Sequence, residues 1–161
     1  MKKIAVFLLI FATILSACGT NQSAIEENEA IEISEESIKM GEIVYDSDDI
    51  VVTYLGIESK PDAIFGSRIE IKFDIENNTD KDIVIQAQGL IVDGVEVDSS
   101  LITMNEQIAV NDSGIAILRV TDIFYEGLPN VEEKVDLSLK ISDWRDMSDY
   151  ESIISIEINL K

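Results

Sequence analysis

Few side chains in this sequence are suited to covalent or metal chemistry. Among 161 residues there is one cysteine, Cys18, and no histidine. The lack of histidine excludes Ser-His-Asp and Cys-His catalytic groups and His-ligated zinc. A single cysteine excludes an internal disulfide and a Cys₄ metal site. Cys18 is therefore the side chain whose type and position best indicate a covalent reaction.

The residues before Cys18 have the pattern of a secretory signal. Lys2 and Lys3 form a basic start, and residues 4–15 are apolar apart from Thr13. This apolar run is too short to span a bilayer, which needs about 20 residues. Residues 15–18 read Leu-Ser-Ala-Cys and resemble the lipobox of bacterial lipoproteins. That resemblance implies transfer of a diacylglycerol to the Cys18 thiolate and cleavage between residues 17 and 18.

The resemblance implies a location as well as a modification. We expect residues 1–17 to be a signal peptide, residues 18–41 a lipid-anchored Cys and acidic tether, and residues 42–161 a folded domain. Two acyl chains such as palmitate give stable anchoring to the cell membrane. The mature protein would then be extracytoplasmic and lipid-anchored. The alternative is an uncleaved anchor with an incidental cysteine.

The tether is acidic and contains no aromatic residue. Its composition predicts a self-repelling linker, which as coil would reach about 25 Å. The spacing of Ile31, Glu35 and Ile38 leaves a helix open as an alternative. The tether has a single basic residue, Lys39. Its acidic residues before Lys39 are Glu26, Glu27, Glu29, Glu32, Glu35 and Glu36.

From residue 42 onward the apolar residues recur with a period of two. Ile69, Ile71, Phe73 and Ile75 alternate with charged residues, as in a half-buried antiparallel strand. Similar runs rich in β-branched residues predict strands over 50–57, 83–92, 114–120, 135–141 and 154–160. About seven short strands separated by turns indicate an all-β sandwich.

Turn signals separate these runs. Asp93-Gly94 between two valines predicts a two-residue hairpin, because a type I′ turn needs positive φ at both positions. Other turns are expected at residues 77–81, 111–114 and 128–130. The stretch from residue 121 to 128 has room for one helical turn.

The stretch from residue 69 to 120 carries a resemblance to a known family that covers roughly residues 50–160. It pairs an alternating strand with Asn77-Asn78-Thr79-Asp80-Lys81 and a further strand, followed by Val92-Asp93-Gly94 and Asn111-Asp112-Ser113. This pattern is similar to the immunoglobulin-like domains of unknown function on Gram-positive surface lipoproteins. The resemblance implies an immunoglobulin-like antiparallel β-sandwich and no catalytic residues.

Acidic side chains offer the clearest candidate binding site. In immunoglobulin order, the loop near residue 77 and the loop near residue 143 fall at the same end. A weak Ca²⁺ site there is one interpretation, since Ca²⁺ takes 6–8 oxygen ligands. A solvated acidic surface is the favoured alternative. The candidate ligands are Asn77, Asp80, Asp143, Asp146 and Asp149.

The other candidate side chains are few. Trp144 is the single tryptophan, and we expect it to cover the core, with ligand stacking as the alternative. Phe124 and Tyr125 are expected to plug one end of the sandwich rather than to form an exposed patch. The arginines 68, 119 and 145 are too far apart in sequence to suggest a polyanion site.

Composition limits the function further. The net charge is −20, which argues against nucleic-acid binding. No pair of the 32 acidic residues is marked for acid–base catalysis, and we do not expect an enzyme. We expect a lipid-anchored binding module that contacts a protein or cell-wall partner. The alternative is an accessory or structural subunit of a cell-envelope complex.

Overall fold

The computed structural model describes residues 38–123, 127–146 and 151–161. These residues form two antiparallel sheets and one short 3₁₀ turn, η1 (Ser99–Leu101). The ten strands are β1 (Ile43–Asp46), β2 (Ile50–Asp62), β3 (Gly66–Asn77), β4 (Ile83–Val92), β5 (Val95–Glu96), β6 (Ile102–Thr103), β7 (Asn105–Ile108), β8 (Asp112–Thr121), β9 (Lys134–Asp143) and β10 (Glu151–Asn159).

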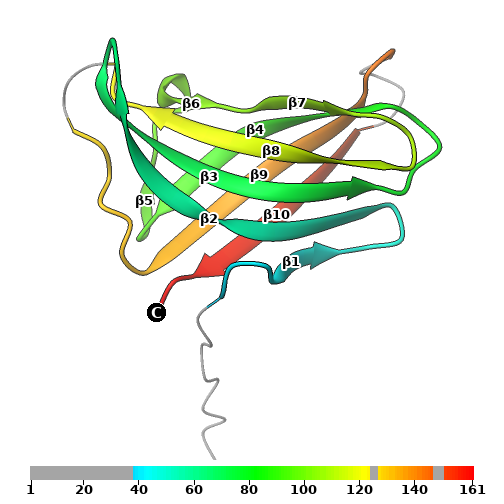
Figure 1. Cartoon of the computed structure of the whole chain (residues 1–161), viewed down its shortest axis with the longest axis horizontal. Coiled ribbons are helices and arrows are strands. Elements are labelled where there is room, and N and C mark those ends of the chain that lie inside the picture. The colour runs from blue at the N-terminus through cyan, green and yellow to red at the C-terminus, as the bar shows by residue number, and fades with distance from the viewer. Residues whose placement is uncertain (1–37, 124–126, 147–150) are drawn as a thin grey trace, which may run out of the picture. The chain divides into compact units, whose positions relative to one another are not determined.

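The strand order is that of an immunoglobulin-like sandwich. One sheet, sheet A, has the order β1-β2-β3-β8-β6, and the other, sheet B, has the order β10-β9-β4-β5 (Figure 1). Strand β7 also pairs with β4, beside the start of that strand. With β2 as the first strand, these orders match the A-B-E-D and G-F-C sheets of the immunoglobulin fold. The all-β prediction is therefore confirmed.

The long strands lie where the period-two pattern predicts them, and β4 has the predicted bounds. The prediction of about seven strands was too low, because β1, β5, β6 and β7 are two to four residues long. Such short segments show no periodicity. They form because a neighbouring strand offers free backbone groups, which is information outside the segment itself.

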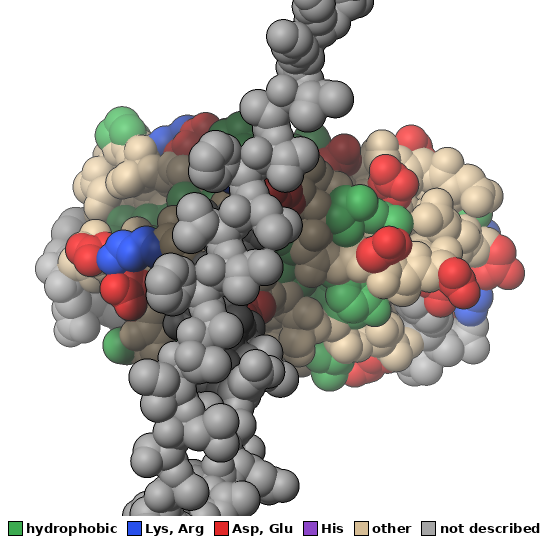
Figure 2. Space-filling view, turned by 90° about the horizontal axis from the view of Figure 1, so that it is seen from below, with side chains coloured by type: hydrophobic (Ala, Val, Ile, Leu, Met, Phe, Trp, Pro, Cys, Tyr) green, Lys and Arg blue, Asp and Glu red, His purple; other side chains and the backbone are tan. Residues whose placement is uncertain are grey.

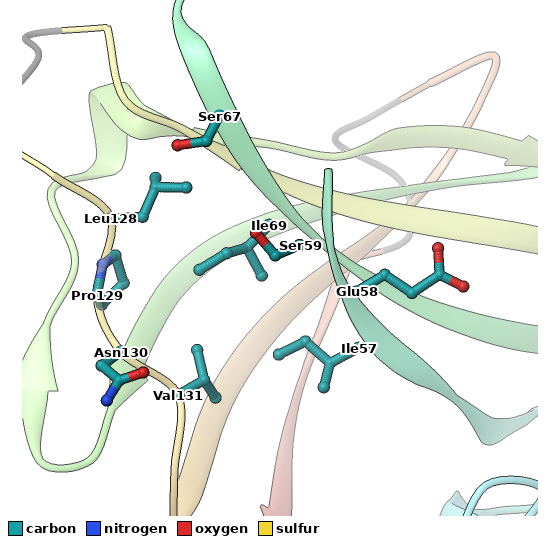
Figure 3. Close-up of a pocket in the computed structure, with 9 residues that line it drawn as sticks. All are labelled: Ile57, Glu58, Ser59, Ser67, Ile69, Leu128, Pro129, Asn130 and Val131. Carbon is teal, nitrogen blue, oxygen red and sulfur yellow. The ribbon is translucent and has the colours of Figure 1, made fainter. Parts of the chain in front are cut away.

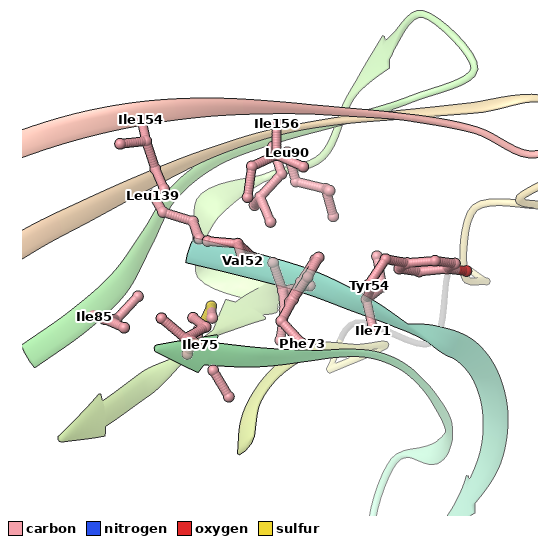
Figure 4. Packing of buried hydrophobic residues seen from close by; sticks show 14 of the residues in the cluster. Val52, Tyr54, Ile71, Phe73, Ile75, Ile85, Leu90, Leu139, Ile154 and Ile156 are labelled. Carbon is pink, nitrogen blue, oxygen red and sulfur yellow. The ribbon is translucent and has the colours of Figure 1, made fainter. Parts of the chain in front are cut away.

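The core lies between the two sheets. Ile71, Phe73 and Ile75 of β3 are at most 1% exposed and face Leu139 and Ile156 of sheet B (Figure 4). The rings of Tyr54 and Phe73 pack tilted, with centroids 6.3 Å apart. Strand β4 is central in sheet B, and Ile83, Val84 and Ile85 are all buried. Burial of alternate positions along Ile71–Ile75 thus fixes the register of β3, whereas the start of β4 is buried on both faces.

The hairpin turn after β4 has the predicted geometry. Asp93 and Gly94 have φ of 48° and 80°, and they join β4 to β5. The Asp93 carboxylate also accepts hydrogen bonds from the backbone N–H groups of residues 132, 133 and 134. Lys134 N–H donates the leading hydrogen bond that lowers the pKa of Asp93. One short motif therefore fixes both a hairpin and the start of β9.

The strands define two ends of the sandwich. The loop end comprises residues 47–49, 78–82, 109–111 and 144–146. The hairpin end comprises the β2–β3 turn, the Asp93-Gly94 turn and residues 127–133. Ile38 also lies at the hairpin end, where its N–H donates to the carbonyl of Asn159 at the end of β10 (Figure 1).

Within the described residues, no helix is long and apolar enough to cross a membrane. The expected signal peptide, Cys18 and almost all of the tether lie outside the described residues, as do Phe124 and Tyr125.

Candidate functional site: the loop end

Hydrogen bonds and ion pairs hold the four segments of the loop end together. Asn78 N–H donates to the carbonyl of Asp49. Asp82 accepts from Val110 N–H through its side chain and from Trp144 N–H through its carbonyl. These contacts join residues that are distant in sequence, as expected for the loops of an immunoglobulin-like sandwich.

Asn77 organises the loop after β3. Its side chain is completely buried. Its amide Nδ2 donates to the carbonyls of Lys81, Ile108 and Ala109 at 2.8 Å, 3.3 Å and 2.9 Å. Its Oδ1 accepts from the N–H and hydroxyl of Thr79. Asn77 therefore satisfies buried backbone groups, and both ends of its amide are already occupied.

Asp143 has a comparable structural role at the end of β9. Its carboxylate accepts from the backbone N–H of Arg145 and of Asp146. Lys81 Nζ lies 3.5 Å from Asp143 Oδ2. These partners, Arg145 N–H first, lower the pKa of Asp143. The carboxylate is thus held ionised by groups of the protein itself.

The predicted cation ligands are only partly brought together. Asp80 and Asp143 line one small cavity of about 170 Å³, but Lys81 and Arg145 line it too. Asn77 is turned inward, and Asp149 lies outside the described residues. Among residues 38–123, 127–146 and 151–161, no three acidic or cysteine side chains are arranged to hold a metal ion. A cation site at the loop end therefore stays a prediction.

Trp144 does not cover the core, and the expected lid is wrong. The residue is 46% exposed. Its backbone N–H bonds to Asp82 in the neighbouring loop, so the chain turns out of sheet B directly after β9. Val110, 40% exposed, is bound to the same Asp82. The loop end therefore presents an indole and a valine among charged groups.

The surroundings of Trp144 carry both signs of charge. Arg145 is highly exposed and lies 3.6 Å from Asp82 Oδ2. Asp80 is exposed on the same loop as Lys81. Elsewhere acidic side chains outnumber basic ones, as on the face of the body shown in Figure 2. An aromatic ring beside charged groups is a common composition of protein-binding surfaces, where Trp and Arg are enriched.

A second charged cluster lies on the outer face of sheet A. Glu70 is only 3% exposed although it points away from the core. Lys60 Nζ lies 2.8 Å from its Oε2, and Arg68 Nε lies 2.9 Å from its Oε1. Arg119 Nε lies 3.5 Å from the same Oε1. The hydrogen bond from Lys60, followed by that from Arg68, lowers the pKa of Glu70.

This cluster was not found by sequence reasoning. Arg68 and Arg119 are distant in sequence, but the pairing of β3 with β8 places Glu70 opposite Arg119. The one sequence signal was the alternation of charged and apolar residues along β3, which predicts a charged outer face but no partner for Glu70. Because the carboxylate already binds three cations, the cluster stabilises the sheet and leaves little free charge for an anion.

A groove with a mixed lining runs along sheet A at the hairpin end. It has a volume of about 370 Å³ and lies between β2, the start of β3 and residues 128–131 (Figure 3). Ile57, Ile69, Leu128 and Val131 form its apolar lining, and Glu58 is its charged residue. Ser59, Ser67 and Asn130 also line the groove, so its surface is mixed, and it lies at the end where the tether joins the body.

Comparison with known proteins adds no family. No family model matches the chain, and no curated protein resembles it closely enough to count as a relative. The function must therefore be argued from the residues and their geometry.

Proposed function

We propose that this chain is a lipid-anchored, extracytoplasmic binding module that contacts a protein or cell-wall partner through the loop end. The observation that carries the proposal is the half-exposed indole of Trp144 on a loop held in place by Asp82. Exposed Trp beside Arg and charged rim residues is the usual composition of an interaction hot spot.

The anchor comes from the sequence. Leu-Ser-Ala-Cys at residues 15–18 after a short apolar run predicts lipidation of Cys18. The tether joins the body at Ile38, which bonds to Asn159 at the hairpin end. Since β10 runs nine residues from the loop end to that point, about 27 Å separates the two ends. The tether therefore leaves the body at the hairpin end, and the loop end is the end farther from that point.

We also propose that the chain has no catalytic step of its own. The carboxyl groups with shifted pKa in the described residues, such as Glu70 and Asp143, are shifted downward by their hydrogen-bond partners. A general acid at neutral pH needs the opposite shift. This pattern supports bound, structural anions rather than acid–base chemistry.

The proposal is tested by photo-crosslinking on intact cells that express the full chain. A photoreactive residue at position 145, next to Trp144, should give a defined adduct. The same residue at position 64 is the matched control, because Ile64 is 72% exposed at the opposite end. Trp144→Ala should abolish the adduct at 145 without changing the amount of anchored protein.

Adducts of equal yield from both positions would contradict a site at the loop end. An adduct at 145 that persists in the Trp144→Ala variant would show that the indole is not needed for binding. An adduct from position 64 alone, with an envelope protein, would favour the accessory-subunit alternative.

A further inference from the structure

Strand β10 ends sheet B with an edge that no described strand pairs with. It bonds to β9 over its whole length, from Glu151 opposite Ser142 to Asn159 opposite Lys134, without a register shift. On its other side, the described residues 38–123, 127–146 and 151–161 contribute no paired strand. Within the described residues, this edge of β10 is approached only by β1 and by Ile38, and neither forms a paired strand along it.

The direction of the backbone groups along β10 follows from one hydrogen bond at its end. Leu160 N–H donates to the carbonyl of Glu133, one residue beyond the Asn159–Lys134 pair. Asn159 is therefore a non-hydrogen-bonded partner of Lys134, and its own N–H and C=O point away from β9. Because this direction alternates along an antiparallel strand, Ile153, Ser155 and Glu157 also direct their backbone groups outward.

The chain already uses this edge once. Ile38 N–H donates to the outward carbonyl of Asn159 at 2.6 Å. Sheet A also carries β1 outside β2, whereas sheet B stops at β10. Ile43 of β1 is 58% exposed. In sheet A, β1 is an additional outer strand beside β2. A further strand beside β10 would give sheet B an additional outer strand as well.

Most other sheet edges are protected in ways that β10 is not, although β6 pairs with β8 only at Arg119 and Val120. Edge strands β1, β5, β6 and β7 have at most four residues. The unpaired half of β2 contains Lys60 and Pro61 and follows a bulge between Tyr54 and Gly56. Lysine, proline, bulges and short strands all discourage the addition of a strand. Strand β10 contains none of these features and has four isoleucines.

We propose that the free edge of β10 binds an extended segment of a partner protein as an added antiparallel strand. The partner segment has apolar residues at its centre and a lysine or arginine at each end. Ile153 is 57% exposed and offers an apolar contact. Glu151 and Glu157 flank it on the same face; each forms an ion pair with a lysine of β9, Lys140 and Lys134, yet their side chains stay 46% and 57% exposed. Cross-strand pairs of opposite charge and of apolar residues stabilise such an addition.

The charges disfavour a second copy of this chain at the same edge. Pairing two β10 strands about Ile154 places Glu151 opposite Glu157, and each chain carries −20. Like charges directly opposite one another are destabilising. A cationic partner segment meets no such repulsion. This site is distinct from the loop end and does not depend on the role proposed for Trp144.

The probe is the heptapeptide Lys-Val-Thr-Val-Ile-Thr-Lys, added to the full chain solubilised in detergent. Its residues are chosen to lie opposite Glu157 through Glu151 in that order. Amide hydrogen exchange should slow at Ile153, Ser155 and Glu157, whose N–H groups point outward. The N–H groups of Ile154 and Ile156 bond to β9 and should change little. This alternation distinguishes strand addition from binding elsewhere.

Two modified peptides serve as matched controls that leave the protein unchanged. N-methylation of the third residue, opposite Ser155, removes a donor that faces β10 and should weaken binding about tenfold or more. N-methylation of the fourth residue removes a donor that faces away and should have little effect. Replacing both lysines by glutamate should also weaken binding about tenfold.

Ser155→Pro tests the same point on the protein, since it removes only an outward N–H. Equal binding by the two methylated peptides, or uniform protection along β10, would overturn the proposal. Protection of the outward N–H groups that grows with protein concentration, without peptide, would instead assign the edge to a second copy. Trp144→Ala should leave peptide binding unchanged, so this test and the loop-end test fail separately.

Discussion

Lys81 Nζ lies 3.5 Å from Asp143 Oδ2, and this ion pair joins the loop after β3 to the end of β9. Lys81 lies in the loop that connects sheet A to sheet B, and Asp143 is the last residue of β9 in sheet B. Their contact places the segment that carries Trp144 beside Asp80 and Asp82. The pair thus has a positional role: it helps to hold the surface that we propose as the binding site.

The first prediction concerns the anchor. Cys18→Ala removes the thiolate that would accept the lipid, so the chain should be released or left unprocessed. Cys18→Ser is a closer control of size and should behave in the same way. Membrane fractionation and intact mass measure both variants. Normal processing and anchoring of Cys18→Ala would refute the lipoprotein assignment.

The second prediction concerns Asn77. Asn77→Ala removes a buried donor from the carbonyls of Lys81, Ile108 and Ala109, and it should lower the free energy of unfolding by about 2–4 kcal/mol. Asn78→Ala is the matched control, because Asn78 is exposed, and its effect should stay within about 0.5 kcal/mol. Urea denaturation measures both. Similar losses would show that the buried amide is not what holds the loop.

The third prediction concerns pH. The pKa of Glu70 is lower in the folded chain than its usual value of 4.5, since Lys60 and Arg68 bind its ionised form. This contribution is present above pH 4.5 and is lost as the pH falls through the lowered pKa. Glu70→Gln should therefore reduce stability at neutral pH by about 1–2 kcal/mol and flatten its decline below pH 4.5.

Glu76→Gln is the matched control for Glu70→Gln. Glu76 lies on the same strand but is exposed. Its replacement should leave the acid-induced loss of stability in place. If both variants have the same pH profile as the parent chain, the ion pairs of Glu70 contribute nothing measurable.

The fourth prediction concerns cations at the loop end. Asn77 is committed to backbone groups, and Asp143 to Lys81 and two N–H groups. We therefore expect millimolar Ca²⁺ and Mg²⁺ to raise the melting temperature of the full chain by the same small amount, through screening of its charge. A Ca²⁺-specific rise of about ten degrees, reversed by EDTA, would instead establish the site predicted from sequence.

Local sequence determined much of this protein. The alternation of Ile69, Ile71, Phe73 and Ile75 predicted the face of β3 that lies in the core. Asp93-Gly94 predicted the hairpin with positive φ at both residues. The number of short alternating runs and the turns between them indicated the β-sandwich. These features are local because side-chain alternation and turn geometry depend on a few consecutive residues.

The tertiary structure decided which distant residues meet. Pairing of β3 with β8 places Arg119 opposite Glu70. The order of strands brings Lys81 into an ion pair with Asp143. It also left Trp144 exposed, although the residue follows a buried strand. No spacing in the sequence encodes these outcomes. They arise because strand order and the ends of the sheets are set by the burial of the whole core, which no single segment contains.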